Sequence, residues 1–374
     1  MTRPGENAGK ATKNELTGRE RWKRALHYGP VDRPVNVEFG YWDETFVEWH
    51  KQGLPRQVND NVVGERYFGL DYYANFGTPI RIIPAYEQKV LAESDGYRDT
   101  LNSGGQVIRQ KLDGHDRIPH YLKYPVETRE DWNQYKKRLD PDSPERFPDV
   151  AAIKAQYENR DYPLGISAGS LFGWVRDCMG FEQACMLPHL DPAWFEEWIE
   201  HLTHLFCTVL ERFLPVIRFD HASMWEDMCF KQGPMMNPTH FKRYMVPRYR
   251  RITDLLRKYG VDVVILDCDG NIDELVPLWL AGGVNAMFPL EVACGSDPVK
   301  YRQRYGRDVL LFGGVNKREL VKGPEAIDAE LARLRPLIDD GGYAPHVDHR
   351  CPPDVSMKNY IYYLRRKLEV FAMR

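Results

Sequence analysis

The sequence predicts an α/β fold, a (β/α)8 TIM barrel, because short apolar strands alternate with longer amphipathic helices along most of the chain. This alternation is typical of a parallel sheet whose strands are joined by helices. About eight candidate strands can be recognised, which is the number that closes such a barrel. They are Pro34–Phe39, Arg81–Pro84, Leu164–Ser167, Asp220–Trp225, Asp262–Asp267, Val284–Pro289, Val309–Phe312 and Gly342–His346. A doubly wound open sheet is the alternative, but no Gly-rich phosphate loop follows an early strand.

The elements around these strands have local sequence signals. Thr17-Gly-Arg-Glu20 is a capping box that predicts the start of a helix. Asp43 is expected to cap a short second helix. Residues 86–111 contain Asp-Gly and Gly-Gly between short alternating runs, which predicts a small antiparallel meander inserted into the barrel. Apolar residues spaced three and four apart predict a long, half-buried helix over Pro192–Phe213.

Composition excludes several classes of protein. The 374 residues are 43% hydrophobic and 28% charged, as in an ordinary globular protein. The formal net charge of -3 argues against a nucleic-acid surface. No apolar run is long enough to cross a bilayer, and the seven cysteines, without paired short spacings, indicate free thiols in the cytoplasm. We expect a disordered tail over residues 1–14 and one domain over 15–374.

Charged residues follow several of the predicted strands, where the active site of a barrel enzyme lies. The candidates for catalysis are Glu226, Asp227, Glu291 and His349. Those for substrate binding are Tyr41, Trp42, Trp225, Arg81 and His346. Carboxylates held together in a cleft raise each other's pKa unless a cation or a proton relieves them. The site should therefore bind a metal or a cationic group, or use protons in acid–base chemistry.

Each candidate also has a structural interpretation. Asp269 could cap the helix that follows its strand. Glu226 and Asp227 could pair with Arg218 or Lys231 on the surface. The aromatic candidates could be ordinary core residues. The joint placement of these groups at one rim is the stronger argument for function.

The same residues carry a family resemblance. The segments are Arg19–Leu26, Val31–Val35, Leu311–Val315 and Asp348–Asp354. From about residue 17 to its end, the chain resembles the uroporphyrinogen decarboxylase superfamily, and the last segment is similar to its Gly-His-(x)3-Pro-(Asp/Glu) motif. The resemblance implies a (β/α)8 barrel that forms a homodimer. The decarboxylase proper has two arginines after its first strand that grip substrate carboxylates; the matching Phe39–Phe46 has none and contains Asp43 and Glu44. Acidic residues there would repel a polycarboxylate.

The other branch of the superfamily consists of cobamide-dependent methyltransferases, which bind Zn²⁺ through His-x-Cys and a later Cys. The matching positions here are Asp267, Asp269 and His349. The resemblance therefore implies a three-ligand site for Zn²⁺ or a similar divalent ion, in which Cys268 or Cys351 could substitute if the register shifts. Carboxylate ligands favour harder ions than thiolates do. A protein with no tightly bound cofactor stays an alternative.

Three functions follow from these observations. The leading hypothesis is a methyltransferase that demethylates a small methylated substrate and passes the methyl group to a corrinoid on a partner protein. There, Asp267, Asp269 and His349 hold a metal or polarise the leaving atom, and Glu226 or Glu291 supplies a proton. The first alternative is a decarboxylase for a smaller acid, anchored by Arg81 and Arg33, with His349 as proton donor. The second is a non-catalytic protein that binds a tetrapyrrole or corrinoid.

Overall fold

A curled parallel sheet of seven strands forms the centre of the protein, whose structure is a computed structural model describing residues 15–112 and 119–372. Its order is β1-β6-β7-β10-β11-β12-β13, and every neighbouring pair is parallel. The strands are β1 (Ala74–Phe76), β6 (Leu164–Ser167), β7 (His221–Trp225), β10 (Val264–Asp267), β11 (Ala286–Phe288), β12 (Leu310–Phe312) and β13 (Tyr343–Ala344). This curled α/β arrangement is consistent with a TIM-type barrel.

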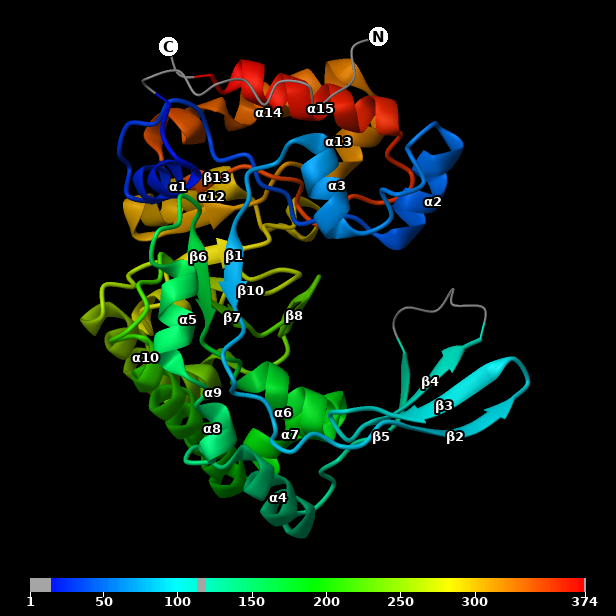
Figure 1. The fold of residues 1–374 in the computed structure, drawn as a ribbon, viewed down its shortest axis with the longest axis vertical. Coiled ribbons are helices and arrows are strands. Elements are labelled where there is room, and N and C mark those ends of the chain that lie inside the picture. The colour runs from blue at the N-terminus through cyan, green and yellow to red at the C-terminus, as the bar shows by residue number, and fades with distance from the viewer. Residues whose placement is uncertain (1–14, 113–118, 373–374) are drawn as a thin grey trace.

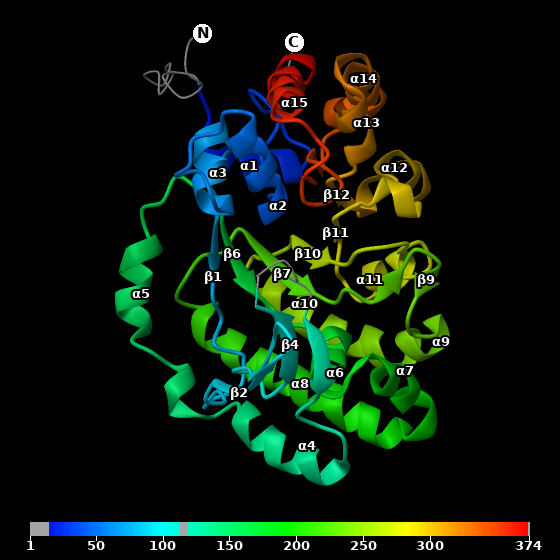
Figure 2. The same ribbon diagram turned by 90° about the vertical axis from the view of Figure 1, so that its right-hand side faces the viewer.

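Helices surround this sheet (Figures 1 and 2). They are α1 (Gly18–Leu26), α2 (Asp43–Lys51), α3 (Asn61–Phe68), α4 (Arg129–Tyr135), α5 (Val150–Tyr157), α6 (Phe172–Met179), α7 (Phe181–Leu190), α8 (Pro192–Phe213), α9 (Pro238–His240), α10 (Val246–Lys258), α11 (Val276–Ala281), α12 (Pro298–Tyr305), α13 (Lys317–Lys322), α14 (Pro324–Asp340) and α15 (Met357–Val370). None of the described helices combines the length and apolar character needed to cross a membrane.

Several local predictions are confirmed. The Thr17–Glu20 capping box is present at the start of α1, with both of its reciprocal hydrogen bonds. The long helix α8 has the predicted bounds, and its apolar stripe is buried. Six of the eight predicted strands match strands of the sheet, most of them with slightly shorter bounds. Asp43 is the first residue of α2 rather than its cap, which is Trp42; a carboxylate in the first turn still favours the helix dipole.

Two predicted strands are wrong. The segment Arg81–Pro84 is irregular because its backbone is bonded elsewhere: the Arg146 guanidinium donates to the Arg81 carbonyl at 2.7 Å, and the Ile83 N–H donates to the Arg138 carbonyl at 2.7 Å. The strand that pairs with β6 is instead β1. Pro34–Phe39 is extended but forms no strand, because proline has no N–H to donate and the Asn36 N–H is bonded to the Asp71 side chain at 2.9 Å.

The predicted insertion is an antiparallel sheet that projects from one side of the body (Figure 1). It contains β2 (Lys89–Ser94), β3 (Tyr97–Leu101), β4 (Val107–Lys111) and β5 (His120–Lys123). The fourth strand extends the insertion beyond the predicted end at residue 111. Asp95 and Gly96 both have positive φ, 53° and 79°, as the tight turn between β2 and β3 requires. A short hairpin, β8 (Cys229–Phe230) and β9 (Gly233–Pro234), lies outside both sheets. The predicted disordered tail, residues 1–14, lies outside the described residues.

A buried ion pair fixes the extended segment 34–42 between the two edges of the parallel sheet. The Lys367 Nζ of α15 donates to Glu38 Oε1 at 2.6 Å, and both side chains are almost fully buried. Glu38 also accepts from the Tyr363 hydroxyl at 2.8 Å and from the Val347 N–H at 3.0 Å. Gly40 accepts from the Cys351 N–H beyond β13, at 2.9 Å. Charge and hydrogen bonds together therefore hold this segment where an eighth strand would lie.

We expect Lys367→Met to lower the free energy of unfolding by about 3–5 kcal/mol, because the Glu38 carboxylate would stay buried without its cation. Urea denaturation followed by circular dichroism measures this loss. Lys358→Met is the matched control: this lysine is exposed on the same helix, and the change should stay within about 0.5 kcal/mol. Equal effects of the two substitutions would contradict the importance of the buried pair.

Candidate functional site

Three carboxylates meet at the carboxyl ends of β7 and β10. Asp267 is the last residue of β10, Asp269 lies two residues further on, and Asp227 follows β7. Asp227 has a φ of 42°, in the left-handed region that is costly for a residue with a side chain. Burial raises the pKa of Asp267 well above its usual range, and the charges of Asp269 and Asp227 raise it further. The charged form of Asp267 is therefore disfavoured at this position.

Two arginines that the sequence reasoning missed flank these carboxylates. Arg176 of α6 donates to the backbone carbonyl of Asp227 and approaches its Oδ2 at 3.3 Å. Its charge lowers the pKa of Asp227, but burial raises that pKa more. Arg350 lies with its guanidinium 5.4 Å from the Trp42 ring centre and lowers the pKa of Asp267. Arg350 lies within the Asp348–Asp354 motif, in which only His349 and Cys351 were candidate site residues.

His349 lies beside Asp269, as the sequence argument required. Its Nε2 is 3.3 Å from Asp269 Oδ2, although the two residues are 80 positions apart. The imidazole stacks on Trp42 with ring centres 5.5 Å apart, and Phe39 contacts it edge-on at 5.1 Å. Asp269 Oδ1 is buried and has no hydrogen-bond partner within the described part of the chain. The structure therefore brings an imidazole and an acidic group together at one rim.

Glu226 is placed differently from the other candidates because it is fully buried. Its carboxylate accepts from the N–H groups of Leu171 and Gly173, at 2.8 and 2.9 Å, and from the Tyr249 hydroxyl at 2.7 Å. The alternative that Glu226 pairs with Arg218 or Lys231 on the surface is therefore wrong. Burial raises the pKa of Glu226, and these donors oppose the rise. The side chain holds the loop after β6 against β7 and does not face the mouth.

Glu291 is also engaged by neighbouring groups. Its Oε2 accepts from the Gly270 N–H at 2.9 Å and its Oε1 lies 3.2 Å from Lys317 Nζ. Asp348, behind it, accepts from the backbone of Val292 and Lys317, and burial raises its pKa to about 6. These contacts link the loops after β10, β11 and β13, so Glu291 positions the rim and is less available as a proton donor.

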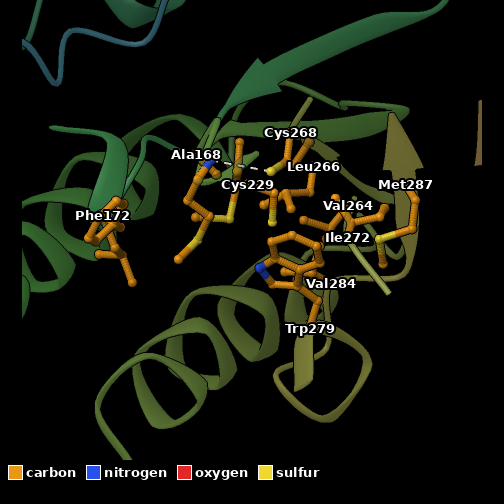
Figure 3. Close-up of a cluster of buried hydrophobic side chains, with 14 of the residues drawn as sticks. Ala168, Phe172, Cys229, Val264, Leu266, Cys268, Ile272, Trp279, Val284 and Met287 are labelled. Atoms are coloured by element: carbon orange, nitrogen blue, oxygen red, sulfur yellow. Dashed lines mark hydrogen bonds between the residues drawn. The ribbon is translucent and has the colours of Figure 1, made fainter. Parts of the chain in front are cut away.

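Three candidates lie in the core. Tyr41 is fully buried among Phe46, Trp49 and Tyr360, and its hydroxyl bonds to that of Tyr360. It therefore does not line a substrate pocket, and the core-packing interpretation holds for it. Cys351 is buried, and its Sγ has only the Pro352 carbonyl within 4.0 Å. Cys268 accepts from the Met228 N–H at 3.3 Å and lies among apolar side chains beside Cys229 (Figure 3).

These positions bear on the predicted metal site. Successive residues of a strand point to opposite sides, so Cys268, directly after β10, faces the core while Asp267 faces the mouth. Among the described residues, no three His, Cys, Asp or Glu side chains are arranged to hold a metal ion. Asp269 and His349 are adjacent, but the proposed third ligand does not join them. Neither cysteine can replace it, because both are buried in the core.

Two adjoining cavities lie at and below the mouth. The mouth cavity, of about 370 Å³, is lined by Arg81, Trp225 and Asp267 among others. The inner cavity, of about 230 Å³, reaches down between the strands and is lined by His346 and His221. Ser223, Met224 and Asp267 line both cavities. Three of the predicted substrate-binding residues, Arg81, Trp225 and His346, therefore face one of these cavities.

The sequence matches the uroporphyrinogen decarboxylase (URO-D) family over residues 110–365, more than half of the chain. The chain belongs to this family. Its structure is similar to that of a methyltransferase from Methanosarcina mazei, with a TM-score of 0.61 and 16% sequence identity, over 96% of this chain and all of that one. No functionally curated protein matches the sequence. The structural likeness establishes a shared fold.

We expect Glu226→Gln to destabilise the protein by about 1–3 kcal/mol, because one of the two backbone N–H groups would face the amide NH2 instead of an oxygen. Thermal unfolding monitored by calorimetry measures the effect. Glu211→Gln, an exposed substitution on α8, is the control and should change stability little. A stability equal to that of the wild type would mean that Glu226 does not anchor the loop after β6.

His221 should make stability depend on pH. Burial lowers its pKa to about 4, so the folded state binds fewer protons than the unfolded state between this value and the ordinary value of about 6.5. The stability that His221 contributes is therefore full above pH 6.5 and is lost as the pH falls towards 4. The difference in unfolding free energy between the wild type and His221→Gln should shrink by about 3 kcal/mol over this range.

Urea denaturation at several pH values gives this difference directly and cancels the titration of other groups. His204→Gln, an exposed substitution on α8, is the control and should change the unfolding free energy little. A pH-independent difference for His221→Gln would show that burial does not lower the pKa of its imidazole in the folded state.

Proposed function

We propose that this protein is a methyltransferase that removes the methyl group of a small substrate and delivers it to a corrinoid carried by a separate protein. The observation that carries the proposal is Asp267, a carboxyl group at the mouth whose pKa is raised by burial and by the charges of Asp269 and Asp227, on the same rim as His349. The fold shared with a methyltransferase supports the same choice. Strongly perturbed pKa values in a cleft are characteristic of catalytic sites.

The chemistry requires a proton at one defined place. When the bond between a methyl carbon and an oxygen or nitrogen breaks, its electron pair stays on the heteroatom, which then needs a proton. Asp267 Oδ can donate that proton because its pKa is raised. The reduced corrinoid supplies the nucleophile that accepts the methyl group. After the transfer, the charge of Arg350 stabilises the Asp267 carboxylate.

The proton donor in this mechanism is Asp267, and not Glu226 or Glu291, which the sequence favoured. Glu226 is enclosed by four donors, and Glu291 is held by Lys317 and the Gly270 N–H. Asp267 has the required exposure to both cavities. His349, held by Asp269 and Trp42, then orients the leaving group at the rim.

A metal ion is a separate proposal. Asp269 and His349 would be two of its ligands, but the described residues do not place a third around the same point. No step of the mechanism is therefore assigned to a metal. Elemental analysis of protein purified without chelators tests the proposal, and loss of bound metal in His349→Ala would locate it.

A decarboxylase for a small acid is the second candidate, and one observation favours it. Arg81 lines the mouth cavity and stacks on Trp174 at 4.3 Å, and no carboxylate lies within ion-pairing distance of it in the described residues. It could bind one substrate carboxylate. Arg33 cannot assist as the sequence suggested, because it pairs with Asp71 at 2.6 Å. Release of carbon dioxide from candidate acids distinguishes this function from methyl transfer.

We expect Asp267→Asn to lower kcat for methyl transfer by about 10²–10⁴-fold, because the amide cannot donate a proton to the leaving group. Wild-type activity should fall as the pH rises through the raised pKa of Asp267, and this decline should be absent from the residual activity of the variant. The change in the corrinoid absorption spectrum measures both quantities.

Asp262→Asn is the matched control, since Asp262 precedes the same strand at the opposite end of the sheet, bonded to His27. Its activity and pH profile should match those of the wild type. Wild-type turnover by Asp267→Asn would remove Asp267 from the mechanism. A corrinoid spectrum that never changes with any methylated substrate would contradict the proposed function itself.

A further inference from the structure

The inner cavity exists because one wall of the sheet lacks the bulky side chains that usually fill a barrel. Barrel interiors are normally packed with branched residues. Here the inward positions of β1, β6 and β7 carry Asn75, Gly165 and Ser223. A Cβ at Gly165 would come within 2.4 Å of His221 Nε2 and 2.5 Å of Asn75 Oδ1, so this position cannot be larger. The opposite wall is aromatic, with Phe288 and Phe312. The cavity is thus a slot between a small polar wall and an aromatic wall.

Two histidines that line the cavity each have a buried nitrogen atom without a hydrogen-bond partner among the described residues. His346 is almost fully buried; its Nδ1 lies 2.8 Å from the Val347 carbonyl, and its Nε2 has no hydrogen-bond partner among the described residues. His221 is also buried, and its Nδ1 is likewise unpartnered in the part of the chain that the structure describes. Buried polar atoms are costly when unsatisfied, so unpartnered atoms in residues that line a cavity point to a ligand that can satisfy them once the rings turn toward it.

Below Asp267, the lining of the inner cavity carries no net charge. Glu38 is neutralised by Lys367 at 2.6 Å. Burial lowers the pKa of both His221 and His346 to about 4, so both rings are neutral at pH 7. A cationic ligand would therefore leave water without meeting a compensating charge, whereas a neutral ring would meet aromatic and uncharged polar groups.

We propose that the inner cavity binds an uncharged, planar ring compound, with its ring between the Phe288–Phe312 wall and Ser223, and its polar substituents hydrogen-bonded to His346 and His221. The size fits: a cavity of ~150 Å³ is enough for benzene, so about 230 Å³ accommodates a ring with one or two small substituents. Because Ser223, Met224 and Asp267 also line the mouth cavity, one substituent reaches Asp267.

This inference deepens the proposed function and rests on it for the reaction: the substrate class becomes the neutral methyl ethers of small rings rather than methylated amines. Binding itself does not need the corrinoid partner. The inference can therefore be tested on the purified chain alone, apart from methyl transfer.

The test is calorimetric titration with two probes of similar size, neutral 2-methoxyphenol and cationic phenyltrimethylammonium. We expect one equivalent of 2-methoxyphenol to bind, at least tenfold more tightly than the cation. Ser223→Leu fills the slot and should weaken binding at least tenfold, whereas Ser223→Ala, the matched control, leaves the space open and should retain it. His346→Phe should weaken binding by about 2- to 12-fold through loss of one hydrogen bond.

Asn75→Leu gives a second filling variant on the neighbouring strand, should Ser223→Leu not fold. Absence of binding by 2-methoxyphenol at millimolar concentration, or equal binding of the cation, would overturn the proposal. Unchanged binding in both filling variants would also overturn it. If the neutral ring binds as expected and no methylated substrate reacts, the site stands and the methyltransferase function fails. If methylamines alone react and the ring does not bind, the methyltransferase function stands and the proposed ring site fails.

Discussion

The ion pair between Glu38 and Lys367 constrains the site more than any residue at the mouth does. It ties the extended segment 34–42 to α15, and through the Val347 N–H to the chain beyond β13. Phe39 and Trp42 belong to this segment and hold the His349 ring from two sides. Because His349 contacts Asp269 from there, the placement of the imidazole depends on a buried charge pair at some distance from the chemistry. The same pair also removes the charge of Glu38 from the inner cavity.

The site combines a charged rim with an uncharged interior. At the rim, three carboxylates and the arginines Arg176 and Arg350 lie close together, so proton positions there respond to small changes in charge. Below it, burial holds the imidazoles of His221 and His346 in the neutral form. Asp267 lies where the two environments meet. A substrate with its ring in the neutral part would present its reacting bond to Asp267, whose pKa is raised by burial.

The fold and part of the site could be predicted from the sequence because they depend on local patterns. Helix α8 follows from apolar spacing, and the strands that carry Asp267 and Trp225 follow from short apolar runs. The segment 34–39 could not be assigned correctly, because its hydrogen bonds go to side chains, such as Asp71, that are distant in sequence. The direction of Cys268 and the burial of Glu226 depend on tertiary packing, which a sequence motif does not contain. Arg176 had no motif, and only the fold brings it to Asp227.

One signal for the inner cavity was present in the sequence. Alternate residues of a strand face the same side, so Gly165 and Ser167 on β6 and Ser223 on β7 line up on the inward face. Small residues at positions that a barrel normally fills with branched ones indicate a hollow interior. At Gly165 the side chains of His221 and Asn75 already occupy the space that a Cβ would need. At Ser223 a larger apolar residue would fill the slot and add apolar contacts, so the small side chain there leaves space for a ligand at the cost of packing. The two histidines with unpartnered nitrogen atoms line the same slot.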